Sequence, residues 1–213
     1  MKVGILGSGP VGQALGRGFI AKRGDEVKIG TRSPDKLDDW VAEVGEAGSA
    51  GTPEEAASFA ELAVVATGWS GTESAIELAG PDNLAGKVVI DVTNPLDHSS
   101  DGPPRLAVGH TDSAGEQVQR WLPHARVVKA FNIVGNTQMV DPDFPDGPPT
   151  MFICGDDDAA KADVTRVCAD FGWPVSDIGG IDKARYLEPM AMVWVMDAIR
   201  GQGFARAFKM LVK

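Results

Sequence analysis

The sequence opens with Met1-Lys-Val-Gly-Ile-Leu-Gly-Ser-Gly-Pro-Val-Gly12, in which a short apolar run leads directly into a glycine-rich turn. Residues Lys2–Leu6 are almost continuously apolar, which is typical of a strand that is covered on both faces. Pro10–Lys22 is predicted to follow as a helix, because proline suits the first helical turn. A strand, a glycine turn and a helix in this order predict the first unit of a Rossmann fold.

The turn itself has the G-x-G-x-x-G spacing, which predicts dinucleotide binding when it joins a strand to a helix. Gly7 allows the tight turn, Gly9 lets the backbone approach a pyrophosphate, and Gly12 permits close packing of helix on strand. The helix would present free N–H groups and the positive end of its dipole to the phosphates. The expected contacts in this turn are Gly7, Ser8, Gly9, Pro10, Val11 and Gly12.

The end of the second predicted strand indicates which dinucleotide is bound. That strand, Val27–Gly30, is followed by Thr31 and Arg32, with Lys36 shortly after them. An NAD site would place a carboxylate here to bind the ribose 2′-hydroxyl, and the strand end carries none. A hydroxyl, a guanidinium and an ammonium group instead match a 2′-phosphate, so NADP(H) is the predicted cofactor.

The rest of the chain alternates apolar runs with helical segments, as in a doubly wound α/β fold. Further strands are predicted at Leu62–Thr67, Lys87–Val92, Arg126–Phe131 and Thr150–Cys154. Helices are predicted at Pro34–Val44, Pro53–Ala60, Gly71–Leu78 and Ala114–Trp121. The predicted fold class is therefore α/β, a Rossmann domain with a mainly parallel sheet and a small C-terminal helical extension.

The predicted division places the Rossmann domain in residues 1–180 and a helical segment in 181–213. Lys183–Lys213 has a helical pattern rich in Met, Trp, Ala and Phe, and its run Met190–Met196 is apolar on nearly every side. This helix is therefore expected to be enclosed. The segment is too short for a catalytic domain, so we expect it to serve an acceptor pocket, a dimer contact or both. Residues 98–115 are interpreted as a long loop.

Composition argues against several classes of protein. Hydrophobic residues make up 43% and charged residues 23% of the chain, as in soluble globular proteins. The formal net charge of −10 argues against nucleic acid as the main partner. The sequence has neither a membrane span nor a signal peptide, so a cytoplasmic protein is expected. Cys154 and Cys168 are interpreted as buried thiols, with no metal site.

Two further strand ends are expected to face the cofactor, because ligands of open α/β sheets bind at the carboxyl ends of strands. They are Ala66–Trp69 and Asp91–Pro95. Thr67 and Asn94 are candidate contacts to the ribose and the nicotinamide carboxamide, although Asn94 before a proline could equally be a turn residue. The predicted set of cofactor-binding residues is completed by Thr67, Gly68, Asn94 and Ala130.

Few residues offer general acid–base chemistry. Tyr186 is the only tyrosine, and Met190 stands where the lysine of a Tyr-x-x-x-Lys pair would be. Lys129 has two open interpretations, one as a pocket residue and one as a structural residue. Hydride exchange between two redox cofactors needs positioning more than proton delivery. The scarcity of acids and bases therefore favours a flavin-like acceptor, and no catalytic residue is assigned.

Motifs spread along the chain together resemble one family. They are Gly7–Gly12, Thr31-Arg32 with Lys36, Val127–Ile133, Phe152–Asp158 and Ala184–Pro189. With these motifs the sequence resembles the coenzyme F420-dependent NADP oxidoreductases over essentially its whole length. The resemblance implies a Rossmann domain, a homodimer, and hydride transfer between NADPH and a deazaflavin. It also implies cofactor contacts from Ser8, Gly9, Pro10, Val11, Thr31, Arg32 and Lys36.

One position departs from that family. Deazaflavin-reducing members carry a histidine in the acceptor pocket where this sequence has Asn132. The stretch Lys129–Asn132 is also similar to the reductase domain of the STEAP proteins, which pass electrons through flavin. The expected acceptor pocket involves Asn132, Ile133, Ser113–Glu116 and Phe204–Leu211. F420, FMN, FAD and metal chelates stay open as acceptors, as do a small carbonyl or imine substrate and a non-catalytic NADPH-sensing module.

Overall fold

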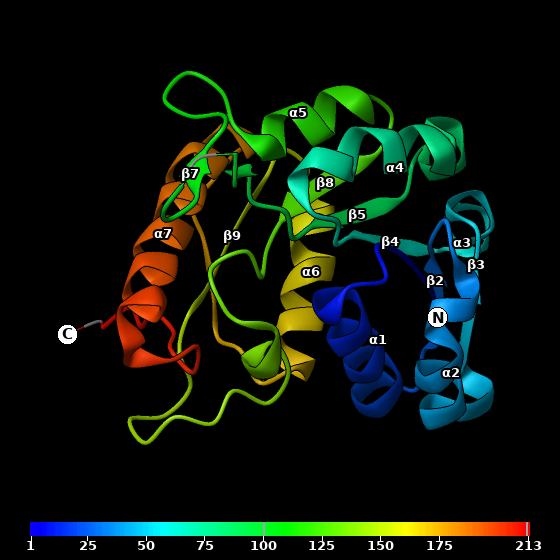
Figure 1. The fold of residues 1–213 in the computed structure, drawn as a ribbon, viewed down its shortest axis with the longest axis horizontal. Helices are drawn as coiled ribbons and strands as arrows, with labels where there is room; N and C mark the ends of the chain where they lie inside the picture. The colour runs from blue at the N-terminus through cyan, green and yellow to red at the C-terminus, as the bar shows by residue number, and fades with distance from the viewer. Residues whose placement is uncertain (100, 212) are drawn as a thin grey trace.

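The structure is a computed structural model that describes residues 1–99, 101–211 and 213. Its centre is an eight-stranded sheet with the strand order β10-β9-β8-β5-β4-β1-β2-β3 (Figure 1). Neighbouring strands are parallel except for β8 and β9. The chain runs outward in one direction from β1 through β2 to β3, then returns to add β4 on the other side of β1. Ligands bind at such a switch point, at the carboxyl ends of the strands.

The strands of this sheet are β1 (Lys2–Leu6), β2 (Glu26–Gly30), β3 (Gly48–Gly51), β4 (Leu62–Val65), β5 (Val88–Asp91), β8 (Arg126–Lys129), β9 (Met151–Gly155) and β10 (Val175–Asp177). A separate antiparallel pair is formed by β6 (Leu96–Asp97) and β7 (Arg105–Leu106). The α-helices are α1 (Pro10–Arg23), α2 (Asp38–Val44), α3 (Pro53–Phe59), α4 (Thr72–Ala79), α5 (Ala114–Trp121), α6 (Asp158–Asp170) and α7 (Ala184–Asp197). Short 3-10 segments include η1 (Pro34–Leu37), η3 (Trp69–Gly71) and η6 (Ile181–Lys183), and α7 continues into the π-helical η7 (Ala198–Gln202).

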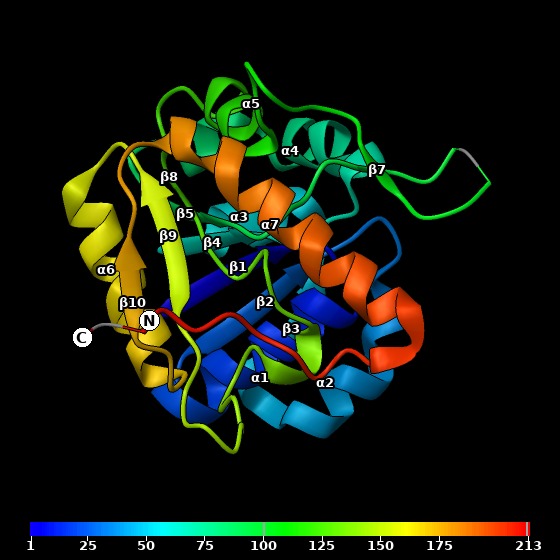
Figure 2. The same ribbon diagram turned by 90° about the vertical axis from the view of Figure 1, so that its left-hand side faces the viewer.

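Helices cover both faces of the sheet (Figures 1 and 2), which explains why its strands are apolar at nearly every position. Val3 and Ile5 of β1 belong to one core cluster together with residues of α1, α2 and α6. Leu6 belongs to a second cluster, which contains residues of α3, α4, α5 and α7. Gly4 faces α3 so closely that a Cβ there would lie 2.2 Å from the Ala56 carbonyl oxygen. Side chains of one strand thus alternate between two separate cores.

The predicted fold class is confirmed: the sheet is mainly parallel and has Rossmann-like α/β topology. Each predicted strand and helix is present with slightly shifted ends, although Pro34–Val44 is divided into η1 and α2. The edge strands β3 and β10 were not predicted, because neither has the run of apolar residues that marks a buried strand. The interpretation of 98–115 as one continuous loop is wrong at β7 and at the start of α5. Ser100, in this segment, lies outside the described residues.

The prediction of a helical pattern up to Lys213 is wrong beyond η7. Gly201 and Gly203 have φ angles of 88° and 82°, in the left-handed region that ends a helix. The chain then returns to the start of β9, where Thr150 N donates to Phe208 O at 2.8 Å. The expectation of an enclosed α7 is also wrong on one side, because Val193 is 61% exposed. Val212 lies outside the described residues.

Aromatic packing holds α1, α6 and the chain after β8 together, and it provides a test of the fold. The Phe171 ring lies 5.1 Å from that of Phe19 and 5.9 Å from that of Phe131, and its side chain is fully buried. Phe171→Ala should lower the free energy of unfolding by about 3–5 kcal/mol, because it leaves a cavity in the core. Denaturant unfolding followed by tryptophan fluorescence measures this change.

The matched control is Phe204→Ala, since the Phe204 side chain is 61% exposed. This variant should change the free energy of unfolding by less than about 1 kcal/mol. Equal losses in the two variants would contradict the packing described for Phe171.

Candidate functional site

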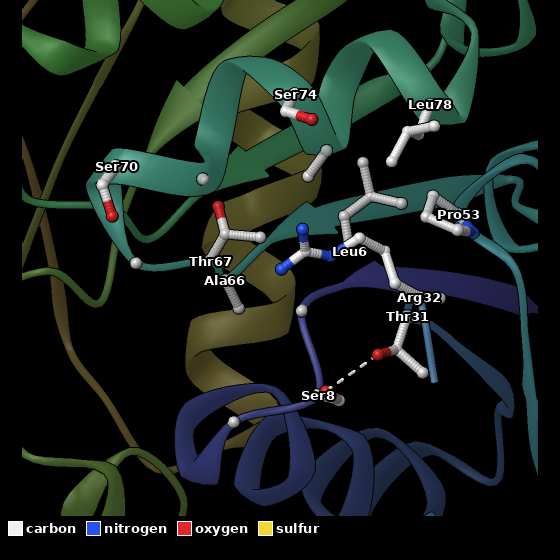
Figure 3. A pocket seen from close by; sticks show the side chains of 16 residues that line it. Leu6, Ser8, Thr31, Arg32, Pro53, Ala66, Thr67, Ser70, Ser74 and Leu78 are labelled. Atoms are coloured by element: carbon white, nitrogen blue, oxygen red, sulfur yellow. Dashed lines mark hydrogen bonds between the residues drawn. The ribbon is translucent and has the colours of Figure 1, made fainter. Parts of the chain in front are cut away.

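A cavity of about 490 Å³ lies at the carboxyl ends of β1, β2 and β4 (Figure 3). Of the residues predicted to bind the cofactor, it is lined by Gly7, Ser8, Gly9, Thr31, Arg32, Thr67 and Gly68. These residues come from three strand ends that are far apart in the sequence. The structure therefore brings together most of the residues that the sequence assigns to one dinucleotide.

The glycine turn is tightly packed on its sheet side and open on its cavity side. Gly7 has a φ of 123°, which L side chains rarely adopt, and its N–H donates to Gly30 O at 3.1 Å. A Cβ on Gly12 would lie 2.0 Å from the Gly7 carbonyl oxygen, so only glycine allows α1 to begin here. A Cβ on Gly9 would instead meet no atom within 4 Å. This open space fits a pyrophosphate that approaches the backbone.

The N-terminus of α1 adds to the anion-binding character of the turn. Gly9, which has no side chain to cap the helix, is its N-cap residue, and Pro10 occupies the first helical position. Val11 is half-buried in the first turn of the helix. The first N–H groups of a helix have no partner inside it. The N–H groups of this turn are therefore suited to donate to phosphate oxygens.

The turns after β1 and β2 together place a hydroxyl pair and a guanidinium at the rim of the cavity. Ser8 Oγ donates to Thr31 Oγ1 at 3.2 Å, the contact drawn as a dashed line in Figure 3. The guanidinium of the exposed Arg32 points over the cavity in the same view, and no carboxylate of the described residues pairs with it. Lys36 is exposed on η1 and does not line the cavity. Its contact with a 2′-phosphate stays a prediction.

The wall formed by η3 and α4 was missed by sequence reasoning. Ser70, Gly71, Ser74, Ala75 and Leu78 line the cavity there, and Pro53 lines it from α3. Leu78 is 49% exposed, so this wall offers apolar surface as well as hydroxyl groups. The available signal was the run after β4, Thr67-Gly-Trp-Ser-Gly71, whose two glycines and serine are typical of a turn.

Asn94 and Asn132 meet at the ends of β5 and β8, beyond the cavity. Asn94 Nδ2 donates to Asn132 O at 2.7 Å, and Asn132 Nδ2 donates to Asn94 Oδ1 at 2.9 Å and to Leu187 O at 3.0 Å. Asn132 is 5% exposed, and its Oδ1 has no hydrogen-bond partner among the described residues. Ala130 and Ile133 are buried in the core, so the contacts predicted for them and for Asn94 stay predictions.

Phe131, between Ala130 and Asn132, has a φ of 61°. A bulky residue in the left-handed region carries backbone strain, which in folded proteins is concentrated at functional sites. The left-handed residue turns the chain at the end of β8, directly before Asn132. The strained position therefore lies next to the amide pair.

The sequence left Lys129 open as a pocket residue or a structural residue, and its buried contacts support the structural role. Its Nζ lies 2.8 Å from Asp91 Oδ2 and 3.1 Å from Glu188 Oε1, and all three side chains are fully or almost fully buried. Burial lowers the pKa of Lys129, but the two carboxylates outweigh that effect and raise it overall. Burial raises the pKa of Glu188, although Lys129 opposes this shift.

The elements expected to form the acceptor pocket are only partly adjacent. Ser113 caps α5, and Glu116 in the first turn of that helix pairs with Arg185 of α7. A second cavity of about 620 Å³ lies beside this pair, between the 106–110 segment and the start of α7. Ala205–Phe208 line another cavity with Trp194, while the Phe204 carbonyl lies near Gly135. The structure thus does not bring Ser113–Glu116 and Phe204–Leu211 together in one of these cavities, and their role at an acceptor stays a prediction.

The described residues also bear on the predictions for the two cysteines, for metal ligands and for membrane spans. Cys154 and Cys168 are free and buried, as predicted, and burial raises the pKa of Cys154 to about 12. No group of His, Cys, Asp or Glu side chains in that part of the chain could hold a metal ion. None of its helices is long and apolar enough to cross a membrane.

Comparison with known proteins agrees with this geometry. The family described as "NADP oxidoreductase coenzyme F420-dependent" matches residues 2–95. The F420-dependent NADP reductase of Methanocaldococcus jannaschii is 28% identical over 199 residues, which cover 88% of each chain. The metalloreductase STEAP3 of Rattus norvegicus is 30% identical over 90% of this chain, which spans only 36% of the length of STEAP3.

A crystal structure extends the similarity to the whole chain. It is that of a protein from Arthrobacter sp. FB24, itself described only provisionally as an F420-dependent NADP-reductase, and it is 37% identical. The match covers 100% of both chains with a TM-score of 0.94. With this agreement in sequence and fold, the chain belongs to the family of coenzyme F420-dependent NADP oxidoreductases.

Proposed function

We propose that this chain transfers a hydride between NADP(H) and a deazaflavin, coenzyme F420, or a flavin such as FMN or FAD. The observation that carries the cofactor assignment is the arrangement of Ser8, Thr31 and Arg32 at one end of the cavity. A free guanidinium beside two hydroxyl groups matches the oxygens of a 2′-phosphate. The names of the matched family and of the archaeal relative support F420 as the acceptor, and the similarity to STEAP3 keeps a flavin open.

The direction of the bound cofactor follows from the order of the strands. Neighbouring strands lie about 4.8 Å apart, so β5 is roughly 14 Å from β2 across the sheet. An extended dinucleotide spans a comparable distance. With its 2′-phosphate at Thr31 and Arg32 and its pyrophosphate at Gly9, its nicotinamide end would reach Asn94 and Asn132.

The residues at that end would bind and orient the ligand instead of transferring protons. The chemistry that a bound NADPH supplies is hydride donation from its nicotinamide ring. The Asn94–Asn132 pair is uncharged, and the ammonium of Lys129 behind it is occupied by two carboxylates. An uncharged pair suits hydride transfer to another redox cofactor, because this reaction needs alignment of the two rings more than a proton donor.

Removal of the proposed phosphate ligand should change cofactor preference. Arg32→Ala should raise the KM for NADPH at least about tenfold and leave that for NADH nearly unchanged, because one charge-assisted hydrogen bond is lost. Steady-state oxidation of each cofactor under the same conditions measures both values. Arg166→Ala is the control, since Arg166 pairs with Asp163 at the exposed surface of α6. Equal effects of Arg32→Ala on both cofactors would rule out its role at the 2′-phosphate.

The acceptor is tested by NADPH oxidation with F420, FMN, FAD, ferric chelates and simple cyclic imines in parallel. We expect turnover with F420 or a flavin, with a kcat/KM at least about a hundredfold above that for any imine. Turnover of imines alone would favour a small-molecule reductase. Tight NADPH binding without oxidation by any of these acceptors would indicate an NADPH-sensing module.

We also propose that the chain forms a homodimer through the C-terminal segment, 181–213. Val193, Met196 and Ile199 are exposed along α7 and η7, and Met210 and Leu211 are exposed further along the chain. Exposed apolar side chains gathered in one segment are typical of a surface that a partner covers. A second copy is the partner that the resemblance to the family implies.

Charge on this surface should therefore separate the subunits. Val193→Asp combined with Met196→Asp is expected to halve the molar mass measured by light scattering, because two carboxylates would be buried at the contact. Leu78→Asp makes the same kind of change on α4 and should leave the mass unchanged. A wild-type chain that is already monomeric at micromolar concentration would refute the dimer.

A further inference from the structure

Three buried charged residues lie behind the Asn94–Asn132 pair. Lys129 donates to Thr93 O at 2.6 Å, besides its contacts with Asp91 and Glu188. The three charged side chains are at most 1% exposed, and none of them lines the cofactor cavity. The ammonium is therefore enclosed by three oxygen atoms, Thr93 O, Asp91 Oδ2 and Glu188 Oε1, and Lys129 does not line the cofactor cavity.

The two carboxylates connect this cluster to the backbone of other elements. Asp91 Oδ1 accepts from Thr93 N at 2.9 Å and from Thr93 Oγ1 at 2.7 Å. Glu188 accepts from Ala114 N and Gly115 N, each at 3.0 Å, at the start of α5. The cluster thus joins β5, β8, α5 and α7 in one set of charge-assisted hydrogen bonds.

Stability alone does not account for such a cluster. Burying three charged groups carries a large desolvation cost, and apolar residues of similar volume are often as stable or more so. Ionic groups in a core instead define one geometry, because their hydrogen bonds are directional. The question is therefore which groups this geometry holds in place.

The cluster holds in place the two backbone segments that support the Asn94–Asn132 pair. Thr93, held at its N, Oγ1 and O atoms, directly precedes Asn94. Glu188 directly follows Leu187, whose carbonyl accepts from Asn132 Nδ2 at 3.0 Å. A shift of either segment would change the hydrogen bonds of Asn132, although Asn132 itself does not touch the charges.

The orientation of the Asn132 amide is fixed by its partners. Its Nδ2 faces two oxygen atoms, Leu187 O and Asn94 Oδ1, so the NH₂ group must point toward them. The Oδ1 atom is then left as a buried acceptor without a donor among the described residues. A buried acceptor of this kind is unfavourable until an N–H group approaches it.

We propose that Lys129 is a positioning residue for the nicotinamide end of the cofactor. Through Thr93 and Glu188 it holds the Asn94–Asn132 pair, so that Asn132 Oδ1 accepts a hydrogen bond from the carboxamide N–H of the nicotinamide. This inference rests on the NADP(H) site proposed above. It assigns to the buried charges a role in ligand geometry that they exert without touching the ligand.

The experiment compares two ligands that differ in the nicotinamide end. Adenosine 2′,5′-bisphosphate contains the adenosine and the 2′-phosphate, whereas NADPH also reaches Asn132. Lys129→Met with Asp91→Asn and Glu188→Gln removes all three charges at similar volume. We expect this variant to bind the bisphosphate within about twofold of wild type and to bind NADPH at least about tenfold more weakly, as measured by calorimetry.

If the triple variant does not fold, a single substitution in the cluster tests the positioning role of Lys129. Glu188→Gln keeps the volume and one acceptor oxygen, which can face Lys129 and Gly115 N, but it removes the charge and the acceptor for Ala114 N. It should weaken NADPH binding at least about threefold and leave bisphosphate binding unchanged. Lys87→Met is the control, because Lys87 lies at the other end of β5 and donates to Ala57 O. It should change neither affinity.

Two results would overturn the proposal. One is an unchanged ratio of NADPH to bisphosphate affinity in both cluster variants, which includes an equal loss for both ligands, and the other is a wild-type chain that binds NADPH no better than the bisphosphate. If the wild type binds NADPH but reduces none of the acceptors, only the proposed acceptor fails, and the affinity ratio still tests Lys129.

Discussion

The ion cluster of Asp91, Lys129 and Glu188 is the constraint on which the arrangement of the strand ends of β5 and β8 depends. In an environment of low dielectric constant, a lysine between two carboxylates is held far more strongly than on the surface, and removing one partner leaves a charge without compensation. The cluster fixes the ends of β5 and β8 relative to each other and ties α5 and α7 to both. The C-terminal helix thereby becomes part of the same rigid unit as the sheet.

The two ends of the proposed cofactor site use different physical chemistry. At β1 and β2 the site is made from backbone N–H groups, hydroxyl groups and a free guanidinium, all of which attract phosphate oxygens. At β5 and β8 it consists of two neutral amides that the buried charges hold from behind. In the proposed complex the phosphates would bind at one end, and the nicotinamide ring would be oriented at the other. This separation fits hydride transfer, in which alignment of two rings matters more than proton transfer.

Local sequence patterns indicated most of the first of these ends, although they missed the wall formed by η3 and α4. The roles of Gly7, Gly9 and Gly12 follow from spacing, and Thr31 and Arg32 follow from their place after β2, because all of these depend on neighbours in the chain. The second end could not be predicted to the same depth. Asn94 and Asn132 were both singled out, but their pairing depends on contacts across 38 residues. Glu188, which contacts Lys129, is 59 residues away; it lies in the motif Ala184–Pro189, but nothing in that motif indicates a contact with Lys129.

The errors at the C-terminus have a similar cause. Helical periodicity in Lys183–Lys213 was real, but Gly201 and Gly203 end the helix, and hydrogen bonds to Thr150 determine the path that follows.

Edge strands such as β3, with the sequence Gly-Ser-Ala-Gly, form because a neighbouring strand offers free hydrogen-bonding groups, not because of their own propensity. Tertiary contacts override weak local preference at these positions.

The central claim is that one NADP molecule spans the sheet from Thr31 and Arg32 to the Asn94–Asn132 pair. A crystal structure with bound NADP⁺ tests it most directly. The account predicts the 2′-phosphate within hydrogen-bond distance of Thr31 Oγ1 and the Arg32 guanidinium, with the nicotinamide carboxamide donating to Asn132 Oδ1. A carboxamide bound elsewhere, with Asn132 Oδ1 still lacking a donor, would contradict it.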